Sequence, residues 1–307
     1  MQYLIDASVY VFRAWHSLSD DIVDRDGNPV NALYGFCRFV GDFVEQVRPE
    51  YLAVLFDESF TMSFRSEIYP EYKANREPAP PELKRQFQQC REFTRALGVM
   101  ECAHPIYEAD DLIGTLVSKG RQLGRPSTIV SRDKDLAQLV SRDDTYWDFG
   151  GRGRLTYDQI PGVFGVWPEQ IADFLALAGD SVDNIPGVPG IGKKTAAALL
   201  RHFGSLDDVY ANLDRVHEVT VRGARTLGLK LHAHKDAAML ARKLTGIACD
   251  APLERSLSCL RPAAPDLGAI NALFDRADIG TALRRQAERV SDLVSDSTLP
   301  RLQLQPV

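Results

Sequence analysis

The sequence lacks long apolar runs: none in its 307 residues approaches the length needed to cross a membrane. It begins directly with MQYLIDASVY, without the basic segment and apolar core of a secretion signal. We therefore expect a cytoplasmic protein without a membrane partner. With 45% apolar and 25% charged residues, the chain has a globular composition and is long enough for two modest cores.

Cysteine is scarce as well. The five cysteines are an odd number, and no two have the short spacing of a zinc site or a redox pair. We interpret them as reduced packing residues. The sequence also lacks the G-x-x-x-x-G-K-[ST] pattern of a nucleotide-binding loop, which disfavours nucleotide hydrolysis as the activity.

An overall positive charge is absent too. The formal net charge is −6, whereas proteins that bind nucleic acids usually carry a basic footprint. The distribution is uneven, because residues 185–243 hold ten Lys or Arg against five Asp or Glu. The net charge therefore does not exclude a polyanionic partner for this segment.

Three short runs of β-favouring residues each end in an aspartate. QYLID ends at Asp6, YLAVLFD at Asp57 and STIVSRD at Asp133. Helical periodicities separate these runs, as in residues 31–47 and 109–117. Strands that alternate with helices predict an α/β fold, a mostly parallel sheet flanked by helices. Because ligands bind at the carboxyl ends of such strands, we expect the three aspartates at one edge.

The sequence pattern changes near residue 166. From PEQIADFLALAG onward the strand signals fade, and short helices with glycine breaks continue. We predict an α/β domain over residues 1–165 and a smaller helical domain over residues 166–290. The tail, residues 291–307, has no clear periodic face, so we expect it to be disordered.

Carboxylates accumulate around the predicted strand ends. The cluster YEADD opens the helical period that follows residue 108, and further aspartates occur in SRDKD and GDSVDN. The nine residues are Asp6, Asp57, Glu108, Asp110, Asp111, Asp133, Asp135, Asp180 and Asp183. If they converge, their repulsion raises their pKa values unless cations compensate. Hard oxygen ligands without His or Cys select Mg²⁺ or Mn²⁺ rather than zinc.

Each of these acidic residues also has an ordinary interpretation. A strand-end aspartate is often only a turn residue, and acidic residues at the start of a helix commonly cap it. The metal hypothesis rests on the combination of three strand ends with an acidic helix start.

The segment IPGVPGIGKKTAAALL predicts a hairpin followed by a helix. Glycines at 187, 190 and 192 permit tight turns, and Thr195 leads into an alanine-rich helical stretch. The free amides of a helix start, together with Lys193 and Lys194, are typical of an anion site. We interpret the segment as a helix-hairpin-helix that binds duplex phosphates without reading sequence. A purely structural turn between two helices stays the alternative.

Residues 58–80 form a long segment of aromatic, basic and proline residues without a steady period. Within it, YPEYKANR places Tyr72, Lys73 and Arg76 close together, which suits base stacking and phosphate contact with a single strand. A solvated loop with a few charges has the same composition, so this motif does not decide the matter alone.

Taken together, these motifs resemble the 5′-nuclease (flap endonuclease) family. The resemblance is strongest to the bacterial 5′-3′ exonucleases that also form the N-terminal domain of DNA polymerase I. It is carried by LIDAS, VLFDE, FRSEIYPEYKANR, YEADDLIGTL, SRDKDLAQLV and PEQIADFLALAGDSVDNIPGVPGIGKKTA. These segments span residues 2–200 in order, and a looser match continues to about residue 285. The resemblance implies a PIN-like sheet, a helical arch at about residues 58–90 and a helix-hairpin-helix.

The resemblance also implies roles for individual residues. It assigns a first metal set to Asp6, Asp57, Glu108 and Asp110, with Asp111 nearby. It assigns a second metal set to Asp133, Asp135, Asp180 and Asp183. It places Lys73 and Arg76 beside the scissile phosphate, and it implies a potassium ion at the hairpin on the backbone carbonyls of Val188 and Ile191.

We therefore expect a metal-dependent, structure-specific 5′-3′ exonuclease and flap endonuclease that hydrolyses DNA with two Mg²⁺ or Mn²⁺ ions. Its expected partners are DNA with 5′ ends, flaps or nicks and RNA-DNA hybrids, bound by a monomer. Tyr72, Lys193, Lys194 and Thr195 are the expected DNA contacts. Two alternatives stay open: a non-catalytic structure-specific DNA-binding protein and a PIN-like ribonuclease. No polymerase sequence follows Val307, so we expect no coupling to synthesis within this chain.

Overall fold

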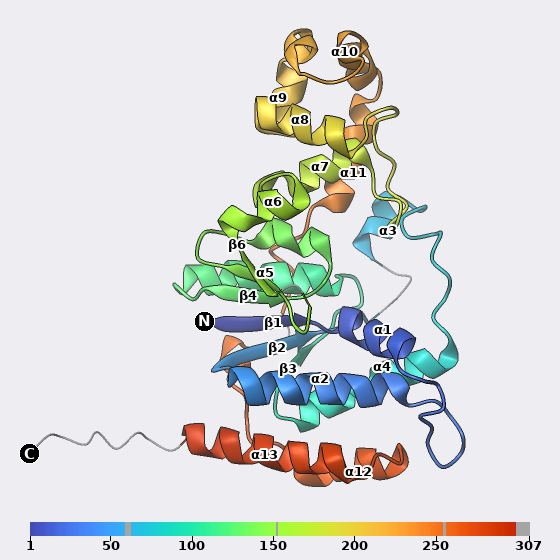
Figure 1. The fold of residues 1–307 in the computed structure, drawn as a ribbon, viewed down its shortest axis with the longest axis vertical. Coiled ribbons are helices and arrows are strands. Elements are labelled where there is room, and N and C mark those ends of the chain that lie inside the picture. The colour runs from blue at the N-terminus through green and yellow to red at the C-terminus, as the bar shows by residue number, and fades with distance from the viewer. Residues whose placement is uncertain (59–62, 152, 254–255, 299–307) are drawn as a thin grey trace, which may run out of the picture. The chain divides into compact units, whose positions relative to one another are not determined.

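The structure is a computed structural model, and it describes residues 1–58, 63–151, 153–253 and 256–298. These residues divide into two compact units. Figure 1 shows their helices and strands, coloured along the chain. The first unit takes residues 1–56, 79–103 and the described part of 252–307, and the second takes 57–78 and 104–251. Each unit thus combines stretches that are distant in the sequence. The sequence-based division into two continuous domains, with one boundary near residue 165, stays a prediction.

The first unit contains three parallel strands, β1 (Gln2–Asp6), β2 (Tyr51–Leu55) and β3 (Met100–Cys102). β2 is the middle strand, with Asp6 opposite Leu55 and Leu55 opposite Cys102. These strands read as nearly continuous apolar runs because both faces of a parallel sheet are covered by helices. Asp6 therefore ends β1, and Asp57 follows the end of β2 by two residues.

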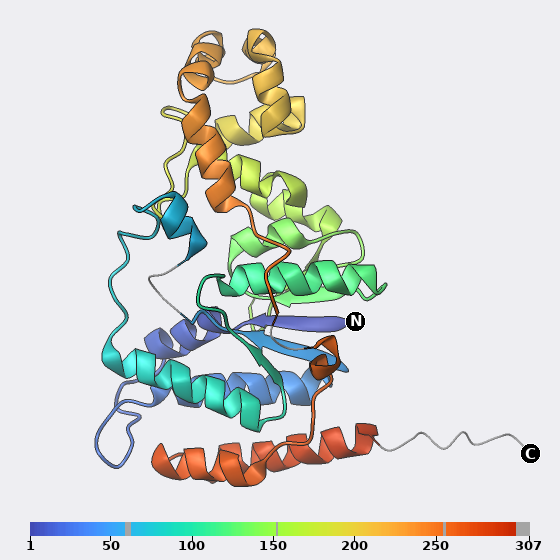
Figure 2. The same cartoon turned by 180° about the vertical axis from the view of Figure 1, so that it is seen from behind.

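The helices of the first unit are α1 (Ala7–Ser17), α2 (Asn31–Val47), α4 (Pro81–Ala96), α12 (Leu267–Arg276) and α13 (Thr281–Thr298), with a short 3-10 helix, η5 (Leu257–Leu260). The buried face of α2 carries Leu33, Phe36, Val40 and Phe43, which recur at helical spacing. Figures 1 and 2 show α12 and α13 beside α4 and α2. Consistent with this arrangement, the rings of Phe93 and Phe274 stack at 5.8 Å.

The tail differs from the sequence-based expectation. Helix α13 continues to Thr298, so the expected disorder is wrong for residues 291–298. Val290 and Val294, one helical turn apart, are both buried, and their packing stabilises the last turns. The rest of the predicted disordered tail, residues 299–307, lies outside the described residues.

The second unit contains the parallel strands β4 (Ser127–Val130) and β5 (Thr145–Asp148), and β6 (Gly153–Thr156), which is antiparallel to β5. The unit also contains α3 (Phe64–Ile68), α5 (Ala109–Gln122) and the 3-10 helix η1 (Lys134–Leu139). Five of the six strands thus pair in parallel, which confirms the predicted sheet. The antiparallel β6 was not predicted.

After β6, the second unit is helical as far as residue 245. Its elements are η2 (Tyr157–Gln159), α6 (Ile160–Phe164), η3 (Pro168–Gln170), α7 (Ile171–Ala178), α8 (Lys193–Phe203), α9 (Leu206–Ala211), η4 (Leu213–Glu218), α10 (Ala224–Ala233) and α11 (Lys235–Thr245). Helices α7 and α8 flank the glycine-rich turn, which confirms the predicted helix-hairpin-helix. None of the helices that the structure describes is long and apolar enough to cross a membrane.

Gly114 allows the chain that follows α11 to pack directly on α5. The amides of Ala248 and Ala251 donate to Asp111 Oδ1 and Thr115 Oγ1 on α5, each at 2.9 Å. A Cβ atom on Gly114 would lie 2.8 Å from Ile247 Cγ2 and 2.9 Å from the carbonyl oxygen of Ala248. A larger side chain there would have to displace this returning segment.

We expect Gly114→Ala to lower the free energy of unfolding by about 1–3 kcal/mol, although alanine favours helix more than glycine does. Urea denaturation of the purified variant measures this difference. Gly162→Ala, in α6, is the matched control, because its added Cβ would meet nothing within 4 Å among the described atoms outside its chain neighbours and its own helix backbone. A Gly114→Ala variant as stable as the Gly162→Ala variant would contradict the packing argument.

Candidate active site

Eight of the nine predicted carboxylates belong to the second unit. Asp6 is the exception, as a buried residue at the end of β1 in the first unit. The following description therefore concerns the second unit alone.

The starts of two helices deliver several of these carboxylates. Glu108 precedes the first turn of α5, and Asp57 Oδ1 accepts a hydrogen bond from the amide of Ala109 at 2.9 Å. Asp133 follows β4 and accepts from the amide of Asp135 at 2.9 Å, which caps η1. Helix starts favour negative charge, so local backbone structure supports the acidic cluster.

The four carboxylates of the second predicted metal set lie near one another. Burial and the neighbouring charge of Asp133 raise the pKa of Asp135 to about 7, and Asp180 and Asp183 add to the repulsion. Burial also raises the pKa of Asp133, which lies near Asp183. Asp180 is held in its turn by paired backbone hydrogen bonds with Ile185. Two pairs of carboxylates that are distant from each other in the sequence thus share one poorly hydrated region.

Cationic side chains lie among the carboxylates. Lys73 Nζ is 2.9 Å from Glu108 Oε1 and 3.9 Å from Asp183 Oδ2, and Arg76 also pairs with Asp183. Burial alone would lower the pKa of Lys73, but the charges of Glu108 and Asp183 outweigh it and hold that pKa above its ordinary value. Two residues predicted for phosphate contact therefore neutralise carboxylates in this arrangement.

Lys134 is a further cation of the cluster that the sequence analysis missed. Its Nζ lies 3.1 Å from Asp180 Oδ2 and 3.9 Å from Asp135 Oδ1. Its place between Asp133 and Asp135 in the sequence was the available signal.

Tyr72 does not have the predicted role. Its side chain is only 6% exposed, and its hydroxyl lies 3.1 Å from Glu108 Oε2 and 3.2 Å from Asp183 Oδ2. Burial and then the charge of Glu108 raise the pKa of Tyr72, so the phenol stays protonated. A buried ring has no free face for a base, and the expectation of DNA stacking is therefore wrong. Tyr72 instead connects the two predicted metal sets.

Asp111 is a structural anchor and not a free metal ligand. It is 0% exposed, and both of its oxygens accept from the Arg65 guanidinium at 2.8 Å. The amides of Glu108 and Ala248 donate to the same carboxylate. The expectation that Asp111 adds to the first metal set is therefore wrong, because its acceptor positions are already used.

Arg65, also missed from the sequence, connects three segments of the second unit. Besides its pair with Asp111, its Nε donates to the carbonyl of Leu244 and its Nη2 to that of Gly246, both at 2.8 Å. The side chain thereby ties α3 to the start of α5 and the end of α11. Its position in α3 fixes the beginning of the segment that carries Tyr72 and Lys73.

The other end of that segment is tied to the turn around Asp183. The amide of Lys73 donates to the carbonyl of Asp183 at 2.9 Å, and the side chains of Asn75 and Asn184 donate to Ser181 and Glu71 carbonyls at 2.8 and 2.7 Å. Lys73 and Asn184 both have a φ of 56°, a left-handed conformation that costs a lysine on the order of 1 kcal/mol. The backbone contacts between these two turns offset this strain.

The donor set fits a hard divalent cation. All the candidate ligands are carboxylate oxygens, and the buried Asp135 Oδ1 has no hydrogen-bond partner among the described residues. Within residues 1–58, 63–151, 153–253 and 256–298, no three His, Cys, Asp or Glu side chains have the spacing of a metal site. In this metal-free arrangement, the positive charge between the carboxylates comes from Lys73, Arg76 and Lys134.

The predicted anion site of the hairpin is exposed. Lys193 and Lys194 form the first turn of α8 and are exposed, and Thr195 follows as a half-buried residue. Gly192 precedes the helix, and no described side chain caps it. Val188 and Ile191 bury their side chains, and the Ile191 amide donates to the Val188 carbonyl at 2.9 Å.

Comparisons with known proteins match both parts of the chain. The family model described as 5′-3′ exonuclease, N-terminal resolvase-like domain, matches residues 1–161, and that described as 5′-3′ exonuclease, C-terminal SAM fold, matches residues 166–267. A 5′-3′ exonuclease of Buchnera aphidicola subsp. Acyrthosiphon pisum is 31% identical over 254 residues, which are 83% of this chain and 88% of that protein.

The chain also matches DNA polymerase I of Pseudomonas aeruginosa, with 40% identity over 273 residues. The matched part is 88% of this chain but only 30% of the polymerase. The chain thus spans less than a third of the DNA polymerase I relatives that it matches.

Solved structures share the fold. T5 5′-exonuclease with bound zinc has a TM-score of 0.65 at 21% identity, with 95% of this chain and 99% of that chain covered. The catalytic core of Rad2 in complex with a DNA substrate has a TM-score of 0.60 at 13% identity, with 95% and 92% covered.

The raised pKa of Asp135 predicts how the stability of the metal-free protein depends on pH. The folded state holds an extra proton between about pH 4 and pH 7, so its free energy of unfolding falls as the pH rises through that window. We expect Asp135→Asn to remove this loss and to stabilise the metal-free protein at pH 8 by on the order of 1 kcal/mol.

Thermal denaturation in EDTA at pH 4.5 and pH 8 measures this effect. The variant should gain on the wild type at the higher pH only, and the exposed Asp143→Asn is the matched control. Equal pH dependence of the wild type and Asp135→Asn would show that this carboxylate is not protonated in the fold.

Proposed function

The chain belongs to the 5′-3′ exonuclease family, and on this premise we propose that it hydrolyses phosphodiester bonds in DNA as a metal-dependent, structure-specific 5′ nuclease. The observation that carries this proposal is the convergence of Asp133, Asp135, Asp180 and Asp183 in one buried region of the second unit. Such crowding opposes stability in the absence of cations, so a ligand requirement is its simplest explanation.

We propose that divalent ions, Mg²⁺ or Mn²⁺, are held by two carboxylate sets. Asp57, Glu108 and Asp110 supply the first set in the second unit, and the four converging aspartates supply the second. The inclusion of Asp6 in the first set stays a prediction. Bound ions of this kind supply positive charge to the phosphate and make a water molecule more acidic. The metal-bound structure of T5 5′-exonuclease supports this assignment by analogy.

In this proposal, the side chains of Lys73 and Arg76 exchange one partner for another. They neutralise Glu108 and Asp183 in the arrangement described above. When these carboxylates are otherwise neutralised, both cations can turn to the scissile phosphate and stabilise the charge that develops on its oxygens. Tyr72 stays protonated between Glu108 and Asp183 and orients them through its hydroxyl.

The hairpin holds the duplex in this proposal. The free amides at the start of α8, including that of Thr195, and the ammonium groups of Lys193 and Lys194 contact backbone phosphates without reading bases. The carbonyls of Val188 and Ile191 would hold a potassium ion beside them. The substrates are DNA with 5′ ends, flaps or nicks and RNA-DNA hybrids, bound by a monomer in the cytoplasm. The Rad2 core was solved with a DNA substrate, which supports DNA as the ligand class.

Cleavage of a 5′-labelled flap duplex tests the proposal. We expect products in Mg²⁺ and none in EDTA, and we expect Asp133→Asn to lose cleavage while it still binds the duplex. Binding without cleavage by the wild type would favour the non-catalytic alternative. Cleavage of single-stranded RNA in preference to the flap would favour the ribonuclease alternative.

A separate prediction concerns Lys73. If its ammonium acts on the phosphate in the transition state, Lys73→Ala should slow single-turnover cleavage by roughly 10²-fold, the loss expected for one preorganised electrostatic partner. Single-turnover rates are measured across a Mg²⁺ titration. Lys119→Ala, near the opposite end of α5 from the acidic cluster, serves as the control. Full recovery of the Lys73→Ala rate at high Mg²⁺ would mean that Lys73 only balances resting charge.

A further inference from the structure

A third lysine lies beside the hairpin, contributed by a different helix. The Nζ atom of Lys230, in α10, lies 3.0 Å from the position that a Cβ atom would take on Gly190, and its Cε and Cδ atoms lie at 3.9 and 4.0 Å. Gly190 has a φ of 81° and stands three residues before Lys193. The Lys230 side chain therefore extends along the tip of the hairpin that we propose to bind DNA.

The fold holds this lysine in place through its neighbours on α10. Leu227 and Leu231 are buried on the two sides of Lys230 in the sequence. Gly228 lets α10 approach η4 closely, because a Cβ there would lie 2.7 Å from the carbonyl oxygen of Leu213. The backbone of α10 at Lys230 is thus held in place, while the residue itself is exposed.

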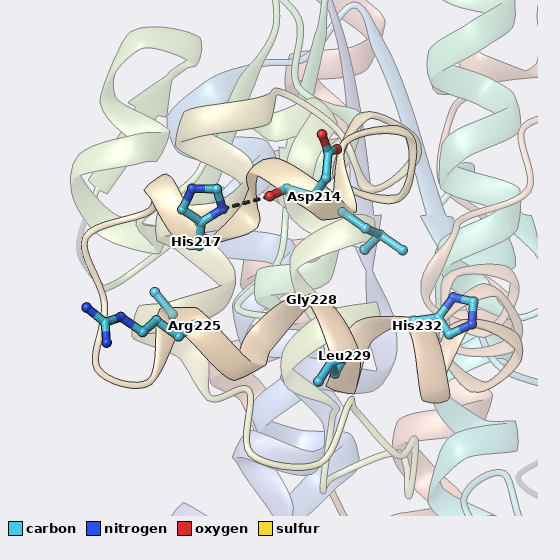
Figure 3. A pocket seen from close by; sticks show the side chains of 8 residues that line it. Asp214, His217, Arg225, Gly228, Leu229 and His232 are labelled. Carbon is cyan, nitrogen blue, oxygen red and sulfur yellow. Dashed lines mark hydrogen bonds between the residues drawn. The ribbon is translucent and has the colours of Figure 1, made fainter.

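Another face of α10 has a different environment. Together with η4 it lines a pocket of about 320 Å³ (Figure 3). Leu213 and Asp214 of η4 and Arg225 and Leu229 of α10 are among its lining residues. Lys230 is not among them, so its substitution tests the hairpin side of the helix and leaves the pocket intact.

The charge of Lys230 is not used within the fold. In the part of the chain that the structure describes, no ion pair or hydrogen bond involves the ammonium group of Lys230, Lys193 or Lys194. Other cations of the same helical region are paired, as Arg242 is with Asp173 at 2.9 Å and Arg215 with Glu218 at 3.1 Å. Three uncompensated ammonium groups from two segments therefore flank one exposed hairpin.

We propose that Lys230 is a third phosphate-binding residue of the hairpin and contacts the backbone of duplex DNA next to Lys193 and Lys194. This inference rests on the proposed function, since it takes the hairpin as the duplex-binding element. A lysine ammonium is a mobile point charge that suits a phosphate and not a base edge. The contact should therefore add affinity equally on every sequence.

The test is a salt titration of duplex binding in EDTA, where no cleavage occurs, followed by fluorescence anisotropy. We expect Lys230→Ala to weaken binding to two unrelated duplexes by the same factor, and to reduce the slope of log affinity against log KCl concentration by about 1. Lys193→Ala with Lys194→Ala should reduce it by about 2, and the triple variant by about 3. Lys230→Arg should retain the wild-type slope.

Lys243→Ala is the matched control, because Lys243 is an exposed lysine of α11 in the same unit. A Lys230→Ala slope equal to that of the wild type and of Lys243→Ala would overturn the inference. So would a lower melting temperature of Lys230→Ala with an unchanged slope, since that result describes a structural cation. Flap cleavage by the wild type, measured in parallel, shows whether the nuclease proposal itself holds.

Discussion

The carboxylates of the second unit could not lie so close together without compensating positive charge. Each ion removed from water loses several kcal/mol of hydration free energy, which a partner must offset. In this fold the partners are Arg65, Lys73, Arg76 and Lys134. This need for positive charge explains why α3 and the segment around Lys73 lie against the carboxylates. The same need accounts for the contact between that segment and the turn around Asp183.

These four cations differ in how firmly they are held. The Arg65 side chain is 3% exposed, pairs with both oxygens of Asp111, lies 3.4 Å from Glu108 Oε2 and donates to two backbone carbonyls, so it is held from several directions at once. The side chains of Arg76 and Lys134 are 46% and 41% exposed, and each can exchange a carboxylate for water or a phosphate at little cost. The same cluster thus contains one permanent pair that builds the scaffold and several exchangeable pairs that leave the site adjustable.

Local sequence patterns were sufficient for the parts of the fold that depend on neighbouring residues. Strands with an aspartate at their end or within three residues after it, the start of α5 and the glycine hairpin all have short signatures, and the structure contains each of them. The roles of Asp111 and Tyr72 could not be read in this way, because the same residue type occurs in a ligand and in a buried anchor. For Asp111, the contact with Arg65 from α3 identifies the residue as a buried anchor and not a metal ligand. This contact depends on the tertiary structure. Lys230 was missed for a related reason, since 40 positions separate it from Gly190 and no periodicity connects them.

The crowded carboxylates also connect stability with function. A group whose pKa rises on folding makes the folded state less stable at neutral pH, as Asp135 does, and local side chains only partly correct this loss. Ligands that bind the folded carboxylates and not the unfolded chain recover it by mass action. Replacing the aspartates with neutral residues would remove the same penalty permanently but would also remove the ligands. The carboxylates that lower the stability of the metal-free fold are therefore the same groups that give it the capacity to bind cations. A variant in which this site is more stable without metal would bind cations more weakly.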